Sequence, residues 1–221
     1  MLEAVVFDFD GVIVDSEEYH YRSIVQALSV HELALTFEKY RADFTGGGDR
    51  DTVSRICSSY GISFDDAQLQ SWLVTKADLY RTLVSDGIRP LPGAVNLVHS
   101  VADKLPLGLA TGSRRSDVEA VLAHIEGGRL IGRFSTIVTS DDVVNPKPYP
   151  DTYATAVEKL GFEADHCLAI EDTPGGIASA KGAGLRVLAV SGTHGQEKLS
   201  QADRIIPTLA GVSLGELKDW F

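Results

Sequence analysis

The chain has few of the residues that mark cross-linked, zinc-binding or nucleic-acid-binding proteins. Its 221 residues include only two cysteines, Cys57 and Cys167, which are too few and too far apart for a disulfide framework or a cysteine-type zinc site. We interpret both as small buried hydrophobic side chains. Lys and Arg number 20 against 31 Asp and Glu, and this excess of acid argues against a nucleic acid or an anionic membrane as partner.

Long apolar runs are also missing. The first apolar run follows no basic segment and is far shorter than the roughly 18 residues that a membrane span requires, so we expect a cytoplasmic protein without membrane contact. The hydrophobic content of 44% and the mean hydropathy of +0.02 are those of an ordinary folded protein with a sizeable core. We take the chain to act as a monomer.

Short apolar, β-branched runs alternate with helical patterns along most of the chain. The expected strands are 4–9, 107–111, 136–139, 167–170, 186–190 and 204–206. Apolar side chains at 118, 121, 122 and 125 have the spacing of one helix face, and Ser116 with Glu119 is typical of a capping box at its start. Strands that alternate with helices favour a Rossmann-like α/β fold, in which a doubly wound parallel sheet has helices on both faces.

The interval from residue 15 to residue 87 differs from the rest. It has amphipathic stretches at 19–28, 52–60 and 67–84, few β-branched runs, and breaks at Gly46-Gly47-Gly48 and Gly61. We interpret it as an all-helical domain inserted after the first strand, with residues 1–14 and 88–221 forming the sheet domain. Two linkers would connect the domains, and an insertion on two linkers can move as a lid.

Asp8 and Asp10 stand where the first apolar run breaks, and no packing argument explains two acids there. Side chains at i and i+2 of a strand point to the same face. Two carboxylates about 4 Å apart repel each other by roughly 4 kcal/mol at an effective dielectric near 20. A bound Mg²⁺ would offset this repulsion, because hard divalent cations prefer carboxylate and carbonyl oxygens.

Polar residues follow four of the expected strands. Besides the two aspartates, they are Thr111 after the second strand, Lys147 past the third, and Glu171 with Asp172 after the fourth. Singly, Thr111 could begin a turn, Lys147 could be a solvated loop lysine, and the two acids could start a helix before the following proline. Ligands of open α/β sheets bind outside the carboxyl ends of the strands. The occurrence of these polar residues at four strand ends therefore favours a single functional site.

The chemistry that fits this set is phosphoryl transfer. Asp8 would attack phosphorus and form an acyl phosphate. The Thr111 hydroxyl and the Lys147 ammonium would hold the phosphoryl oxygens, on which transition-state charge lies. Asp10 would protonate the leaving oxygen and then deprotonate the acceptor, which requires the pKa of Asp10 to rise from about 3.9 toward neutrality.

These residues resemble the motifs of the haloacid dehalogenase superfamily, in the branch with a helical cap inserted after the first strand. The four motifs are matched, in order, by Phe7-Asp8-Phe9-Asp10-Gly11-Val12, Thr111, Lys147-Pro148 and Glu171-Asp172. The resemblance implies metal ligation by the Asp8 carboxylate, the Asp10 backbone carbonyl and Asp172, with Glu171 acting through water. It also implies phosphate ester chemistry, because members that cleave carbon–halogen or carbon–phosphorus bonds typically lack an acid at position 10.

Within that branch the chain resembles β-phosphoglucomutases and related sugar-phosphate phosphatases. Residues 18–22 resemble the mutase sequence entering the cap, where the histidine, here His20, is implicated in gating the general acid. The resemblance also implies substrate contacts for four further residues, which are Arg50, Lys76, Ser113 and Arg114. Taken alone, the basic residues among them could be solvated surface charges, and His20 an ordinary helix residue. The glycine triplet and the Thr111-Gly112 pair depart from the mutase pattern and leave substrate identity open.

The sequence therefore predicts a Mg²⁺-dependent phosphatase that acts on a small phosphorylated metabolite, a sugar phosphate, through an aspartyl-phosphate at Asp8. The alternative is a phosphosugar mutase of the β-phosphoglucomutase type, which shares every part of this mechanism except the acceptor. A non-catalytic phosphometabolite-binding module is a further alternative, although a binder needs no nucleophile. Glycoside hydrolysis fits poorly, because acids one residue apart suit shared metal ligation better than carboxyls that flank a sugar bond.

Overall fold

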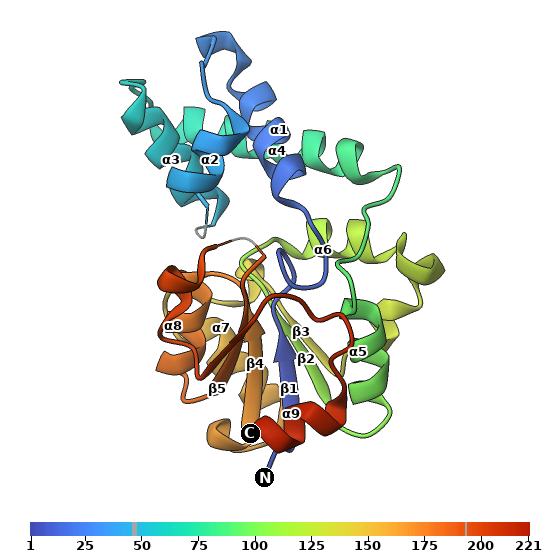
Figure 1. Cartoon of the computed structure of the whole chain (residues 1–221). Helices are drawn as coiled ribbons and strands as arrows, with labels where there is room; N and C mark the ends of the chain where they lie inside the picture. Colours follow the sequence, from blue (N-terminus) through green and yellow to red (C-terminus); the bar gives the residue numbers. More distant parts are fainter. Residues whose placement is uncertain (46–47, 193) are drawn as a thin grey trace.

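A parallel sheet forms the centre of the molecule in the computed structural model (Figure 1). The structure describes residues 1–45, 48–192 and 194–221, so Gly46 and Gly47 of the predicted glycine break lie outside the described residues. The described strands follow the order β3-β2-β1-β4-β5-β6. Their bounds are Ala4–Phe7 (β1), Leu107–Ala110 (β2), Thr136–Val138 (β3), Cys167–Glu171 (β4), Arg186–Val190 (β5) and Arg204–Ile206 (β6). Every predicted strand is confirmed, with shifts of at most two residues at its ends.

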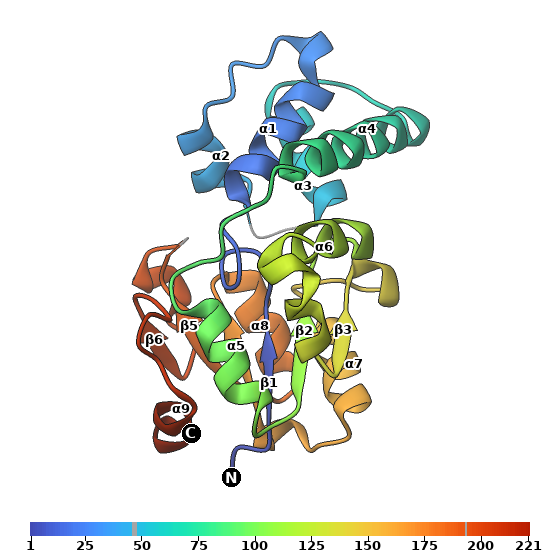
Figure 2. The same ribbon diagram turned by 90° about the vertical axis from the view of Figure 1, so that its right-hand side faces the viewer.

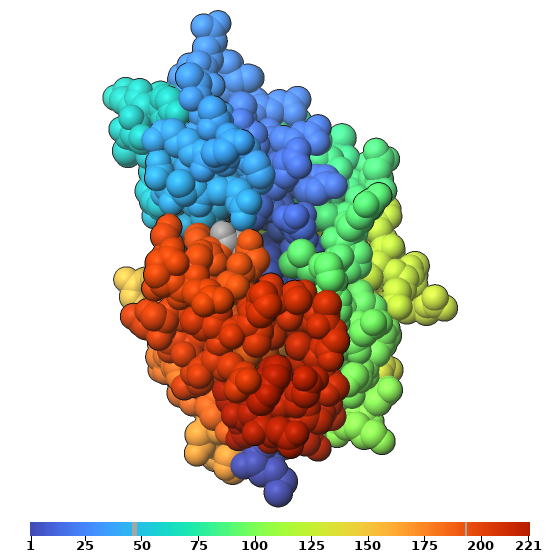
Figure 3. Space-filling model, viewed as in Figure 1, coloured from blue at the N-terminus to red at the C-terminus, as the bar shows by residue number. Residues whose placement is uncertain are grey.

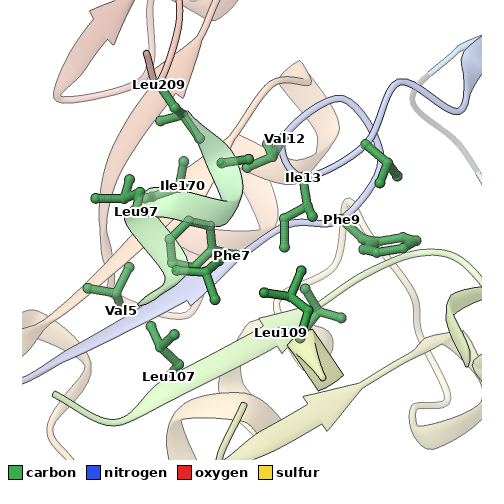
Figure 4. Close-up of a cluster of buried hydrophobic side chains, with 14 of the residues drawn as sticks. Val5, Phe7, Phe9, Val12, Ile13, Leu97, Leu107, Leu109, Ile170 and Leu209 are labelled. Carbon is green, nitrogen blue, oxygen red and sulfur yellow. The ribbon is translucent and has the colours of Figure 1, made fainter. Parts of the chain in front are cut away.

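Helices cover both faces of the sheet, which is why the central strands are apolar on both sides. On one face, Val5 and Phe7 of β1 pack with side chains of α5 (Ala94–Ala102) and α9 (Leu214–Trp220). Figure 4 shows Phe7 among Leu97, Leu109 and Ile170 in this cluster. On the other face, Ala4 and Val6 pack with α7 (Asp151–Leu160) and α8 (Pro174–Gly182). Phe7 is fully buried, and its truncation to Ala would cost about 3–5 kcal/mol.

Among the described residues, four α-helices lie between β1 and α5 in the sequence and above the sheet in Figures 1 and 2. They are α1 (Glu17–Ala27), α2 (Phe37–Asp43), α3 (Asp49–Ser59) and α4 (Asp66–Val84), and we call them the cap. The cap has an apolar cluster of its own, which includes Ile24, Ile56 and Trp72. The predicted α/β fold with an inserted helical cap is therefore confirmed, whereas the domain boundaries at residues 15 and 87 stay a prediction.

Helix α2 was not predicted from the sequence. It has only seven residues, and its start is fixed by the side chain of Thr36, which accepts a hydrogen bond from the Lys39 amide at 3.2 Å. In the space-filling view of Figure 3 the cap rests on the C-terminal part of the core, and Arg41 of α2 donates to the Gly192 carbonyl there at 3.5 Å. The cap also contacts the core through α4, which packs against α6 (Arg115–Leu122).

The two linkers of the cap run side by side. Val14 and Pro90 form an antiparallel bridge, and the Leu91 amide donates to the Ile13 carbonyl at 2.8 Å. Between β1 and this bridge the chain turns at Gly11, whose φ of +78° lies in the left-handed region that glycine adopts without strain. The turn places both aspartates of the first motif beneath the cap.

The predicted capping box of α6 is wrong. Arg115 begins this helix, and its amide donates to the carboxylate of Asp141 at 3.0 Å, so Ser116 lies inside the first turn and caps nothing. Asp141 is 26 residues away in the loop after β3. When the residue that caps a helix comes from so far away in the sequence, no local pattern predicts it.

The structure tests the prediction for the two cysteines. Cys57 and Cys167 are both free and buried, as predicted. None of the described helices combines the length and the apolar character that crossing a membrane requires.

Candidate active site

The ends of three neighbouring strands meet at the ammonium group of Lys147. Asp8 directly follows β1, Ala110 ends β2, and Glu171 ends β4. Lys147, in the loop between β3 and α7, donates to Asp8 Oδ1 at 2.8 Å, to Glu171 Oε1 at 2.6 Å and to the Ala110 carbonyl at 2.9 Å. The carboxyl edge of a parallel sheet thus brings together residues that are 139 positions apart in the sequence.

The charges of this group are incompletely balanced. Burial and the charge of Glu171 raise the pKa of Asp8 to about 8, although Lys147 opposes the shift. Burial alone would lower the pKa of Lys147, but the charges of Asp8 and Glu171 outweigh it and raise that pKa. If all three acids, Asp8, Glu171 and Asp172, were ionised, one ammonium would leave an excess of negative charge, which is part of why the pKa of Asp8 is raised. A further cation would favour the ionised form of Asp8.

Three carboxylates are placed to hold that cation. One oxygen each of Asp8, Glu171 and Asp172 lies within 4.8 Å of the other two, and all three side chains are buried. The donors are all carboxylate oxygens, which fits a hard divalent cation such as Mg²⁺ better than a soft one. The side chain of Asp10 is not part of this group, and the predicted contribution of its backbone carbonyl stays a prediction.

Glu171 is fixed by residues that the sequence analysis did not single out. Its Oε1 accepts a hydrogen bond from the Tyr153 hydroxyl at 2.9 Å, and its Oε2 accepts from the Asp172 amide at 3.0 Å and the Thr173 hydroxyl at 3.2 Å. Tyr153 is fully buried, and the Lys147 ammonium lies 4.7 Å from its ring centre. A buried tyrosine hydroxyl needs a hydrogen-bond partner. The sequence alone did not mark Tyr153, because both its burial and its partner are seen only in the structure.

Asp10 faces a different set of partners from Asp8. Its carboxylate accepts hydrogen bonds from the hydroxyls of Ser16 and Ser113, the latter at 2.6 Å, and lies 3.4 Å from His20 Nε2. Burial would raise the pKa of Asp10, but these three donors lower it below its usual range. The predicted rise toward neutrality is therefore wrong for this arrangement. Strand alternation also does not orient the two aspartates, because β1 ends at Phe7.

A buried polar chain leads from Asp10 into the cap. Lys76 of α4 is fully buried, and its Nζ lies 2.9 Å from His20 Nδ1 and donates to Asp49 Oδ2 at 2.8 Å. The His20 ring stacks on Tyr80 with 4.4 Å between ring centres. An ammonium group can only donate, so a hydrogen bond from Lys76 to Nδ1 would leave the ring proton of a neutral His20 on Nε2, toward Asp10. Asp49, which the sequence analysis did not single out, completes the chain.

A pocket lies between the cap and the strand ends. Asp8, Asp10, His20, Thr111, Ser113 and Lys147 of the predicted site residues line it. Thr111 is fully buried, and its hydroxyl accepts from the Ser113 amide at 3.0 Å.

Arg50, Lys76 and Arg114 were also predicted to contact substrate, and the structure places none of them among the described residues that line the pocket. Arg50 is exposed and forms an ion pair with Asp66 at 2.5 Å, and Arg114 is the half-buried residue before α6.

The chain is similar to known proteins over nearly its whole length. Residues 5–190 match the family model described as haloacid dehalogenase-like hydrolase. Protein CbbY of Rhodobacter capsulatus is 30% identical over 96% of both chains, and validoxylamine A 7'-phosphate phosphatase of Streptomyces hygroscopicus subsp. limoneus is 28% identical over 96% of both.

Solved structures show the same fold over the whole chain. CbbY from Rhodobacter sphaeroides in complex with phosphate has a TM-score of 0.87 and 27% identity, and covers 99% of this chain and 100% of its own. A β-phosphoglucomutase from Clostridium difficile has a TM-score of 0.86 at 21% identity, with 100% of this chain and 97% of that chain covered, which is a likeness of fold.

Proposed function

Because the chain belongs to the haloacid dehalogenase-like hydrolases, and is thus a phosphoryl-transfer enzyme, we propose that it is a Mg²⁺-dependent phosphatase of a small phosphorylated sugar. The observation that carries the proposal is the convergence of Asp8, Lys147 and Glu171 beneath the capped pocket. We also propose that the protein is a cytoplasmic monomer that binds neither nucleic acid nor membrane. These points rest on the sequence.

Asp8 would carry the phosphoryl group. Its free carboxylate oxygen attacks phosphorus, the bond from phosphorus to the sugar oxygen breaks, and the sugar leaves as an alcohol. Lys147, which already holds Asp8 Oδ1 at 2.8 Å, orients the nucleophile and faces the phosphate oxygens. Asp8, Glu171 and Asp172 would hold the divalent cation, which supplies positive charge to the phosphate oxygens when bound.

Asp10 would move the protons. Its low pKa in this arrangement keeps it ionised and therefore able to accept a proton, although a carboxylate becomes an effective base only when its pKa rises toward the working pH. In the second step it would take a proton from the water that attacks the aspartyl-phosphate, which releases inorganic phosphate and restores Asp8. In the first step the same carboxyl must give a proton to the leaving oxygen. That requires its pKa to rise, and displacement of His20 or Ser113 from Asp10 would raise it, because each donor stabilises the ionised form.

Hydrolysis is favoured over phosphoryl transfer to a second sugar. The phosphatase relative is 28% identical over nearly the whole chain, whereas the mutase structure at 21% identity supports the fold alone. A mutase must also exclude water from the aspartyl-phosphate, which asks more of the cap than hydrolysis does.

The test is phosphate release from a panel of phosphorylated sugars in the presence of Mg²⁺. The wild-type chain should release inorganic phosphate, and Asp8→Asn should lower the rate by at least about 10³-fold because the amide oxygen is a poor nucleophile. Asp86→Asn is the matched control, since Asp86 is exposed and is not among the described residues that line the pocket. Circular dichroism should show that both variants fold.

Three results would contradict the proposal. Wild-type turnover by Asp8→Asn would reject the nucleophile. Conversion of β-glucose 1-phosphate to glucose 6-phosphate without phosphate release, with a trace of the 1,6-bisphosphate present, would establish the mutase. A wild-type chain that binds phosphate esters but cleaves none of them would indicate a binding module.

A further inference from the structure

Helix α4 belongs to both domains. In its first half, Trp72 and Leu73 pack in the apolar cluster of the cap. In its second half, Tyr80 and Val84 pack in the cluster of the core, which includes Val118 of α6. A shift of the cap relative to the core therefore changes the contacts between α4 and α6, because packed helices slide past each other when domains move by shear.

Asp117 of α6 has a carboxylate oxygen that lacks a donor. The residue is 1% exposed, and its Oδ1 accepts from the Ser116 hydroxyl at 3.3 Å. Its Oδ2 is buried and has no hydrogen-bond partner among the described residues. Burial raises the pKa of Asp117, and the charge of Lys76 in the cap opposes the rise. A buried carboxylate oxygen without a donor is unfavourable, so we expect the cap to supply one in another position.

Tyr80 of α4 has the complementary group. Its side chain is 1% exposed, and within the described part of the chain its hydroxyl makes no hydrogen bond. Burial raises the pKa of Tyr80, and the charges of Asp10 and Asp117 add to the shift. A buried tyrosine hydroxyl usually finds a partner. Lys76 is a less suitable donor for Asp117, because its ammonium already donates to Asp49 at 2.8 Å.

The ring of Tyr80 supports the polar chain that leads to Asp10. The His20 ring stacks on it with 4.4 Å between ring centres, and Lys76 Nζ lies 4.8 Å from its centre. His20 Nε2 in turn lies 3.4 Å from Asp10 Oδ1. A displacement of the Tyr80 ring therefore moves His20 relative to Asp10.

We propose that Asp117 is a positioning residue that acts through Tyr80. As the cap settles on a bound phosphate ester, the Tyr80 hydroxyl donates to Asp117 Oδ2, and the stacked His20 ring is fixed relative to Asp10. Asp117 is not among the described residues that line the pocket, so it acts without touching the substrate. The inference rests on the proposed function, in which Asp10 gives a proton to the leaving oxygen.

The first test compares two phosphorylated compounds that differ in their need for Asp10. A sugar leaves as an alcohol and needs a proton, whereas acetate leaves acetyl phosphate as a stable anion and needs none. Tyr80→Phe removes only the donor, and Asp117→Ala removes the acceptor. Each should lower kcat/KM for the sugar phosphate that the wild type cleaves fastest by about tenfold, the effect of one lost hydrogen bond. For acetyl phosphate, kcat/KM should change by less than about twofold.

The second test asks whether the two residues act through one contact. If they do, the variant that carries both Tyr80→Phe and Asp117→Ala should lose no more activity than either single variant. Asp117→Asn keeps an acceptor oxygen and should recover most of the activity. The matched controls are Tyr60→Phe and Glu119→Ala, because the Tyr60 hydroxyl donates to the Ala34 carbonyl within the cap and Glu119 is exposed on α6. Both controls should keep the wild-type kcat/KM for both compounds.

The outcomes separate this inference from the proposed function. Equal losses for the sugar phosphate and acetyl phosphate, no loss for either, or losses that multiply in the double variant would overturn the role of Asp117 and leave the phosphatase intact. A wild-type chain that releases phosphate from neither compound would overturn the proposed function, and the inference with it. Tyr80→Phe keeps the ring that stacks on His20, so it decides the inference even if Asp117→Ala does not fold.

Discussion

Replacing Gly176 by Ala should displace Glu171 from the active site. Gly176 lies in the first turn of α8, and a methyl group on its Cα would overlap the Glu171 carboxylate. Glu171 has no room to retreat, since it is fully buried and is held by Lys147 and Tyr153. The backbone of α8 therefore passes against the carboxylate because residue 176 has no side chain.

The expected cost has two parts. Overpacking of a well-packed site costs about 1–3 kcal/mol. A carboxylate pushed out of position also loses hydrogen bonds that involve a charged group, each of which contributes about 1.5–3 kcal/mol. We expect the free energy of unfolding of Gly176→Ala to fall by about 2–5 kcal/mol, and the Mg²⁺ concentration for half-maximal phosphate release to rise.

Gly182→Ala is the matched control in the same helix. A Cβ at position 182 would meet Pro150 Cβ at 3.4 Å, which is ordinary contact, and Ala in place of Gly stabilises a helix by up to about 1 kcal/mol. Urea unfolding and a Mg²⁺ titration of phosphate release on both variants provide the measurements. If Gly176→Ala kept the unfolding free energy and the Mg²⁺ dependence of the wild type, the carboxylate of Glu171 could not lie against α8, and the proposed metal group would be wrong.

Two further predictions concern stability. Asp141→Ala should lower the free energy of unfolding by about 1 kcal/mol because it removes the acceptor of the first amide of α6, whereas the exposed Glu119→Ala should not, as urea unfolding of both would show. For Asp203, burial opposes the shift, but hydrogen bonds from Lys181 and the Val187 amide lower its pKa. A lowered folded-state pKa stabilises the fold above the unfolded pKa, near 3.9, and the gain is lost as pH falls through the folded value. At pH 7 the wild type should therefore be more stable than Asp203→Asn, by less than about 1 kcal/mol because Asp203 is partly exposed. The difference in the free energy of unfolding, measured with urea, should shrink below pH 4. A difference that stays constant with pH would refute the ion pair.

The sequence was sufficient to predict those features that follow from a local pattern together with a general rule of the α/β fold. Each strand is a short apolar run, and the carboxyl ends of parallel strands share one edge. That rule alone placed Asp8, Lys147 and Glu171 together, and the structure joins them through one ammonium. The helical cap followed in the same way from the change of periodicity after the first strand.

The sequence was insufficient to predict the pKa or the role of a side chain whose partners come from several helices and loops. The pKa of Asp10 is set by donors from the linker, from α1 and from Ser113, which is 103 residues away. Asp49 could not be predicted as a site residue among the many acids of the chain, because its role depends on the hydrogen bond that it accepts from Lys76 on another helix. The substrate contact of Arg50 was implied only by the resemblance, and its ion pair with Asp66 depends on how α3 and α4 pack, which no local pattern shows.

The pairing of Val14 with Pro90 brings the two chain connections of the cap to one place. Both crossings between cap and core lie at a single seam, which is closed by the bridge and by the hydrogen bond from Leu91 to Ile13. An insert whose own ends lie one strand spacing apart, about 4.8 Å, would match the ends of the core at this seam, although the contacts of α4 with α6 and of Arg41 with Gly192 would be lost. A different cap at this seam would change the roof of the pocket and leave the group of Asp8, Lys147 and Glu171 beneath it in place.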